Sequence, residues 1–80
     1  MSIAFSIDHR PGTLVAALQL LADAGVDLTK IESRPVPGQP WEYVFYAEFR
    51  FDDPARADAA LSALRRHCRM VKELGRYHAA

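Results

Sequence analysis

Residues 41–51 read WEYVFYAEFRF, and this stretch decides the fold because apolar residues occupy every second position. Side chains alternate between the two faces of a β-strand, so a period of two predicts a strand with one almost wholly apolar face. That face consists of Trp41, Tyr43, Phe45, Ala47, Phe49 and Phe51. We expect it to lie against helices, whereas Val44 and Tyr46 should lie on the opposite, exposed face.

The residues that follow this strand predict a helix and a final strand. Asp52-Asp53-Pro54 is typical of a helix start, because aspartate is a favourable N-cap and proline fits the first helical position. The last turn carries Arg65, Arg66 and His67, where positive charge suits the helix dipole. The inner face should consist of Ala57, Ala60, Leu61 and Leu64. The final strand is expected over residues 69–77.

The first half of the chain predicts a strand over residues 2–7, a helix over 13–24 and a strand over 26–36. Gly25 should end the helix, since glycine enters the left-handed conformation without steric cost. The proline-rich residues 35–40 indicate a turn or hairpin connection. The apolar face of this helix should consist of Leu14, Leu18, Leu21 and Ala22.

The predicted order, strand-helix-strand-strand-helix-strand, is that of the α+β ferredoxin-like βαββαβ sandwich. This fold has a four-stranded antiparallel sheet with both helices on one face. A chain of 80 residues has room for one domain, spanning residues 1–80. A core this small leaves a thin margin of stability, and pairing with a second subunit is a common remedy.

Composition excludes several classes of protein. Ten basic and ten acidic residues balance, which argues against a nucleic-acid or anionic-membrane partner. The single cysteine, Cys68, permits neither an intramolecular disulfide nor a paired-cysteine metal site, and we interpret it as a buried, inert thiol. His67 and His78 are interpreted as surface residues. The start of the chain lacks the features of a signal peptide, so we expect a soluble cytoplasmic protein. We also expect neither a metal nor a cofactor.

Two segments carry polar groups suited to a ligand. In His9-Arg10-Pro11-Gly12-Thr13-Leu14, a turn leads into a helix whose first N–H groups could hold a carboxylate, and Gly12 lacks a Cβ that would keep a ligand away. An ordinary strand-to-helix turn would explain the same residues. In Ile31-Glu32-Ser33-Arg34-Pro35, Glu32 and Arg34 share one strand face and could bind an ammonium and a carboxylate. A solvated edge strand is the alternative for that segment.

Taken together, these segments resemble the ACT domain found at the C-terminus of prephenate dehydratases. The Ile-Glu-Ser-Arg-Pro segment is the most specific part of the resemblance, and the regulatory domains of aromatic amino acid hydroxylases share it. The matching segments are Pro11-Gly12-Thr13-Leu14, residues 27–35 (DLTKIESRP), residues 40–46 (PWEYVFY) and residues 74–77 (LGRY). Thr13 stands where the family usually has alanine, and His9 where it often has Asp or Asn.

The resemblance implies an allosteric, regulatory domain that binds L-phenylalanine, or another aromatic amino acid, where two copies pair as a homodimer. It implies no catalytic residues in this chain, since the larger prephenate dehydratase catalytic domain is absent; a catalytic enzyme domain would be a partner. Leu14 and Ile31 should line the ring pocket, with backbone groups near Gly12 at the polar end. A face-to-face tetramer through Val44 and Tyr46 is a further expectation. The implied ligand-binding residues are His9, Pro11, Gly12, Thr13, Leu14, Ile31, Glu32, Ser33, Arg34 and Pro35.

Other functions fit the fold less well. An acylphosphatase relies on an asparagine, and the chain has none. A heavy-metal chaperone needs paired cysteines, and an RNA-binding platform would need the aromatic residues of the third strand on the open face. The main alternative is a structural ACT module that mediates pairing and no longer binds a ligand.

Overall fold

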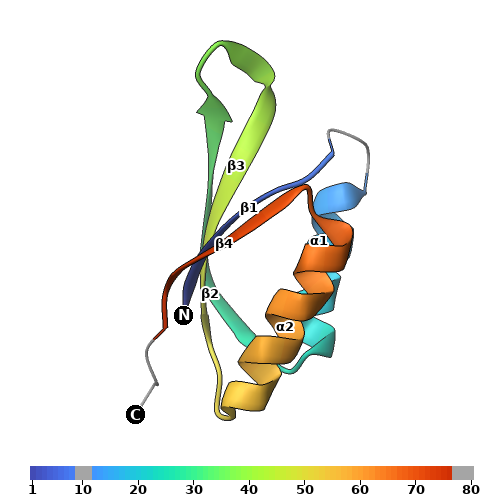
Figure 1. The fold of residues 1–80 in the computed structure, drawn as a ribbon, viewed down its shortest axis with the longest axis vertical. Helices are drawn as coiled ribbons and strands as arrows, with labels where there is room; N and C mark the ends of the chain where they lie inside the picture. Colours follow the sequence, from blue (N-terminus) through green and yellow to red (C-terminus); the bar gives the residue numbers. More distant parts are fainter. Residues whose placement is uncertain (9–11, 77–80) are drawn as a thin grey trace.

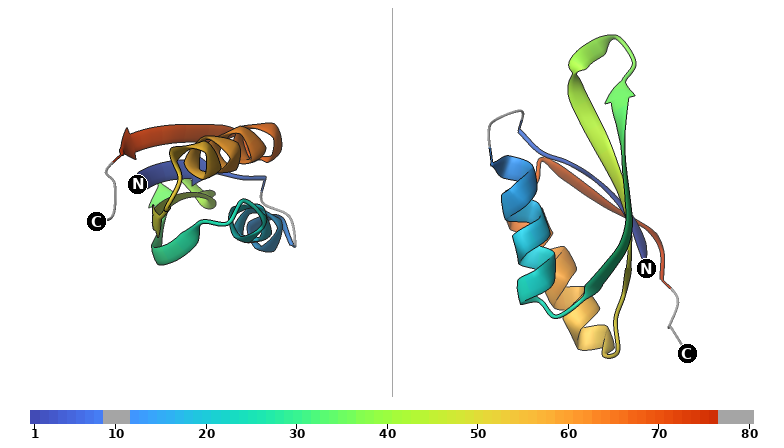
Figure 2. Two further views of the ribbon diagram at one scale, coloured as in Figure 1. Left: turned by 90° about the horizontal axis from the view of Figure 1, so that it is seen from below. Right: turned by 180° about the vertical axis from the view of Figure 1, so that it is seen from behind.

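The computed structural model describes residues 1–8 and 12–76 of the chain. Four strands form one antiparallel sheet in the order β2-β3-β1-β4, and both helices cover one face of it (Figures 1 and 2). The elements are β1 (Ser2–Ser6), α1 (Thr13–Asp23), β2 (Asp27–Val36), β3 (Gln39–Arg50), α2 (Pro54–His67) and β4 (Met70–Gly75). The predicted βαββαβ ferredoxin-like fold is therefore confirmed.

The core lies between the sheet and the two helices, and β3 contributes to it as its alternation predicted. Ala47, Phe49 and Phe51 are buried, and the Phe45 ring stacks on Phe5 of β1 with centroids 5.5 Å apart. Tyr43 lies on the same face, as predicted, but it is 39% exposed because no helix covers it there. The reason is length: the hairpin of β2 and β3 extends beyond the ends of the helices (Figure 1). The side chain of Trp41 lies outside the described part of the chain.

The two helices differ in how well their buried faces were predicted. In α2, Ala57, Ala60, Leu61 and Leu64 are all buried, as expected, and Asp53 caps the helix by accepting a 3.0 Å hydrogen bond from the Ala55 N–H. In α1, Ala22 is exposed, and the prediction that it belongs to the core is wrong. Leu21 is buried, as predicted, and Ala17 is buried in place of Ala22. Leu14, Leu18 and Leu20 are partly buried and pack against the core.

Three connections deviate from the expected boundaries. The turn between β2 and β3 occupies only two residues, because pairing continues to Val36 and resumes at Gln39, with Gly38 at φ +80°. At the same end of the sheet, β1 stops at Ser6 and β4 begins at Met70, so Ile7 and Arg69 flank the strands instead of belonging to them. Gly25 lies at φ +78° just after α1, as predicted. Tyr77, the expected end of the last strand, lies outside the described residues.

Candidate ligand-binding site

Gly12 precedes α1 and opens the first segment singled out in the sequence. Its backbone is left-handed, with φ +82°, and it is exposed. A Cβ built on Gly12 would have no heavy atom within 4 Å among the described residues, so this position is open to an approaching ligand. The first helical hydrogen bond runs from the Ala16 N–H to the Gly12 carbonyl at 2.9 Å. The N–H groups of the first turn therefore precede the helical ladder, as an anion-binding terminus requires.

Thr13 and Leu14 complete this end of the segment. The Thr13 hydroxyl donates a 2.8 Å hydrogen bond to the Asp8 carbonyl, so it ties the end of the turn back to its beginning. Leu14 is half-buried and packs against the core, which leaves part of the residue accessible to solvent. Two further predicted ligand residues, His9 and Pro11, lie outside the described residues.

The second predicted segment, residues 31–35, lies in β2 at the edge of the sheet. Its pairing register with β3 assigns each residue to a face, because directly opposed residues share one. Ile31 and Ser33 oppose Ala47 and Phe45, and Pro35 opposes Tyr43, so these three lie on the side of the sheet that carries the helices. All three are nevertheless exposed, with Ile31 at 37%, because β2 has no neighbour on its outer side.

Glu32 and Arg34 lie on the opposite, helix-free face, as the alternation of a strand predicts. The Glu32 carboxylate pairs with Lys30 at 3.4 Å and with Arg34 at 3.7 Å. The Arg34 guanidinium also lies over the Tyr46 ring, 5.4 Å from its centroid. Both charged groups are thus already partnered within one chain.

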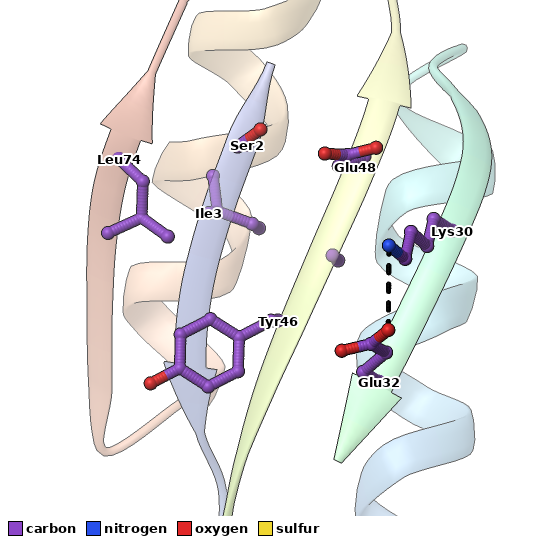
Figure 3. Close-up of a pocket in the computed structure, with 8 residues that line it drawn as sticks. Ser2, Ile3, Lys30, Glu32, Tyr46, Glu48 and Leu74 are labelled. Atoms are coloured by element: carbon purple, nitrogen blue, oxygen red, sulfur yellow. Dashed lines mark ion pairs between the residues drawn. The ribbon is translucent and has the colours of Figure 1, made fainter. Parts of the chain in front are cut away.

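A half-open pocket of about 220 Å³ occupies this helix-free face. Figure 3 shows its wall of charged groups from β2 and β3, with the Lys30–Glu32 pair on one side and the Tyr46 ring and Leu74 on the other. Glu32 therefore faces this pocket and not the turn at Gly12. The two predicted roles, a carboxylate held near Gly12 and an ammonium held by Glu32, are not brought together within a single chain.

The remaining chemistry of the described residues is limited. Among them, no group of three or more His, Cys, Asp and Glu side chains is placed to bind a metal ion. The Cys68 thiol is half-buried, and this burial raises its pKa to about 11, which keeps it protonated and unreactive near neutral pH. Within residues 1–8 and 12–76, neither helix has the length and apolar character that crossing a bilayer requires.

The sequence profile of the ACT domain family matches residues 1–68 of the chain. The chain belongs to the ACT domain family. This ACT domain is 46% identical over 76 residues to a prephenate dehydratase from Mycolicibacterium gilvum. It is 38% identical over 77 residues to a bifunctional chorismate mutase/prephenate dehydratase from Aquifex aeolicus. These alignments cover 92% and 95% of the ACT domain but only 24% and 21% of those proteins.

The ACT domain also matches a solved structure over nearly its whole length. That structure is a prephenate dehydratase from Arthrobacter aurescens in complex with L-Phe, with a TM-score of 0.80 and 30% sequence identity. The match covers 98% of this ACT domain and 25% of that chain. The family resemblance proposed from the sequence, like the fold, is therefore confirmed.

Contacts around the turn before α1 were not found by reasoning from the sequence. Asp8 pairs with Arg69 at 3.6 Å, and the ring of His67, expected to be a simple surface residue, lies 3.1 Å from the Thr13 carbonyl. His67 is exposed, as expected, but it has a specific partner. No local motif announces such long-range pairs. The antiparallel pairing of β1 with β4, which the topology implies, could have placed Asp8 near Arg69.

Proposed function

We propose that this ACT domain is a regulatory module that binds L-phenylalanine between two copies of the chain. The observation that carries the proposal is the match, over 98% of the domain, to a prephenate dehydratase in complex with L-Phe. The geometry of this chain supports the same ligand class. Gly12 offers an open backbone at a helix start for a carboxylate, and Leu14 and Ile31 offer accessible apolar surface for a ring.

The need for a second copy follows from the faces of β2. Within one chain, Glu32 and Arg34 point away from the helical layer that contains Gly12, and each already has an ionic partner. The edge of β2 is open, so another copy can approach Ile31, Ser33 and Pro35 from the side. We propose that the turn at Gly12 from one copy and residues 31–35 of the other enclose the ligand, with His9 and Pro11 contributing from the same turn.

Regulation then requires a catalytic partner. An effector domain acts through a coupling free energy with another site, and the prephenate dehydratase relatives are about four times longer than this chain. We propose that the partner is an enzyme domain of the prephenate dehydratase type. A tetramer formed through Val44 and Tyr46 on the helix-free face stays a prediction; Val44 is half-buried and Tyr46 is 38% exposed there.

Thermal unfolding with and without L-phenylalanine tests the binding function. A ligand at a hundred times its dissociation constant adds about 2.7 kcal/mol to the native state. Each kcal/mol raises the midpoint of a domain this small by roughly 4–8 °C. D-Phenylalanine and serine should have no effect, and tyrosine and tryptophan report the specificity for the ring. If no amino acid shifts the midpoint of a protein that is still dimeric, the domain is a structural pairing module and the proposal is wrong.

A further inference from the structure

The residues that join α2 to β4 make contacts with both ends of the turn that contains Gly12. The end of α2 lies beside the start of α1 (Figure 1). His67, the last residue of α2, places its Nε2 atom 3.1 Å from the carbonyl oxygen of Thr13, just after the turn. Arg69, two residues later, places its Nε atom 3.6 Å from the carboxylate of Asp8, just before the turn.

These contacts form a connected set. The Thr13 hydroxyl donates to the Asp8 carbonyl at 2.8 Å, which links the two ends of the turn to each other. The backbone N–H of Arg69 donates to the Ser6 carbonyl at 2.9 Å, so the arginine is anchored beside the end of β1. Its guanidinium also pairs with Glu42 of β3 at 3.6 Å. Arg69 therefore bridges the beginning of the turn and the third strand.

The contact between Arg69 and Asp8 contributes little to the stability of the whole fold. The side chains of Arg69 and Asp8 are 61% and 48% exposed, and exposed ion pairs contribute only about 0–1 kcal/mol to folding. Such contacts add little to a packed core, but they can restrict the positions of Asp8 and Thr13, which lie on either side of Gly12 in the sequence. The two contacts fall on Asp8, four residues before Gly12, and on Thr13, directly after it; Gly12 is the position where the proposed ligand meets the backbone.

We propose that Arg69 and His67 are positioning residues that hold Gly12 and the start of α1 in the conformation that binds the ligand. The inference rests on the proposed function for its ligand. His67 must donate from Nε2, because a carbonyl oxygen only accepts. Neither side chain is required to touch the ligand. Thr13 serves the same end, since its hydroxyl is directed to the Asp8 carbonyl.

Arg69→Gln and His67→Ala are the test variants. Arg66→Gln is the matched control, because Arg66 is exposed at the same end of α2 and has no ion pair within the described part of the chain. The first measurement is hydrogen exchange of the Ala16 amide, which donates to the Gly12 carbonyl, in the unliganded protein. Faster exchange there in both test variants, with little change in the unfolding midpoint, is the expected result. Unchanged exchange would overturn the proposal.

The second measurement is calorimetric titration of the same variants with L-phenylalanine. Arg69→Gln should weaken binding by about fivefold, the factor that corresponds to about 1 kcal/mol. Arg69→Lys should recover part of this loss, since an ammonium can pair with Asp8 or Glu42 but spans both poorly. Faster exchange with unchanged affinity would refute the link to the ligand. If the unchanged protein binds no L-phenylalanine, the proposed function fails, while the exchange measurement still decides whether these residues order the turn.

Discussion

Replacing Gly12 by alanine tests whether the ligand carboxylate lies against the backbone at Gly12, as the proposed binding mode requires. Gly12 has φ +82°, and no heavy atom of the described residues lies within 4 Å of an added Cβ. The methyl group would therefore meet no steric obstacle among the described residues. It would occupy the space through which we expect the ligand carboxylate to reach the first N–H groups of α1. Valine would occlude that space more completely, but a β-branched residue at positive φ is a conformational outlier.

Gly38 provides a control with the same backbone strain. It lies in the turn between β2 and β3 at φ +80°, and an added Cβ there also has no heavy atom within 4 Å in the part of the chain that the structure describes. An alanine in the left-handed region costs roughly 1–2 kcal/mol at either position. Both variants should therefore lose a similar amount of stability, on the order of 4–8 °C in midpoint for each kcal/mol. A difference in ligand affinity between the two variants is then due to the position of the added methyl group and not to backbone strain.

Thermal unfolding of both variants over a series of L-phenylalanine concentrations is the assay. We expect Gly12→Ala to bind at least about tenfold more weakly, a loss of about 1.4 kcal/mol, and Gly38→Ala to bind as the unchanged protein does. At a concentration one hundred times the original dissociation constant, the ligand would then add only about 1.4 kcal/mol instead of about 2.7. Equal ligand-induced shifts in the two variants would show that the carboxylate does not lie against Gly12, and the proposed polar end would be wrong.

Two further changes probe other parts of the molecule. Ile31→Ser should weaken L-phenylalanine binding severalfold, whereas Met70→Ser, equally exposed but on the helix-free face, should leave it unchanged; calorimetric titration of both variants decides this. Burial raises the pKa of the Cys68 thiol to about 11, and only the thiolate reacts with iodoacetamide. Alkylation should therefore be slow at about pH 8 and become faster only as the pH approaches about 11. The thiol of an unfolded chain has a pKa of about 8.5. Above that pH the unfolded chain loses the thiol proton while the folded chain keeps it. The contribution of Cys68 to the free energy of unfolding therefore falls as the pH rises towards about 11. Fast alkylation near neutral pH would contradict this environment.

The fold was predictable because local patterns agreed with each other. The alternation in β3 and the helical spacing in α2 each identified buried residues from neighbours a few positions away. The error at Ala22 shows the limit of that reasoning. Ala22 fits the spacing of Leu14, Leu18 and Leu21, but it lies at one edge of the apolar face of the helix and is exposed. Leu20, at the opposite edge of that face, packs against the core. Which edge of the apolar face is buried depends on how the helix is rotated about its axis as it packs on the sheet. The spacing of apolar residues does not determine this rotation.

The candidate site was predictable only in part, for a similar reason. Strand alternation assigned Glu32 and Arg34 to one face, and the motif selected the segment. Neither said which face carries the helices; the register between β2 and β3 decides that. The long-range pair of Asp8 and Arg69 needs the topology as well, since the two residues meet only where β1 and β4 lie side by side.

A ligand enclosed by two copies makes ligand binding and pairing a single linked equilibrium. If each site needs the turn at Gly12 from one copy and residues 31–35 from the other, L-phenylalanine binds the dimer and not the monomer. Linkage then requires that the ligand tighten the dimer. With two such sites and a ligand concentration ten times the dissociation constant, the apparent dimer dissociation constant should fall by about a hundredfold.

Sedimentation over a range of protein concentrations, with L- or D-phenylalanine present, measures this shift between species of one and two 9.0 kDa chains. The dimer should persist to lower protein concentrations with the L-enantiomer only. Binding of L-phenylalanine with no change in the dimer dissociation constant would place the site within one chain. It would then have to be formed without the edge-to-edge approach of β2, because a site made by both copies cannot be filled without favouring their association.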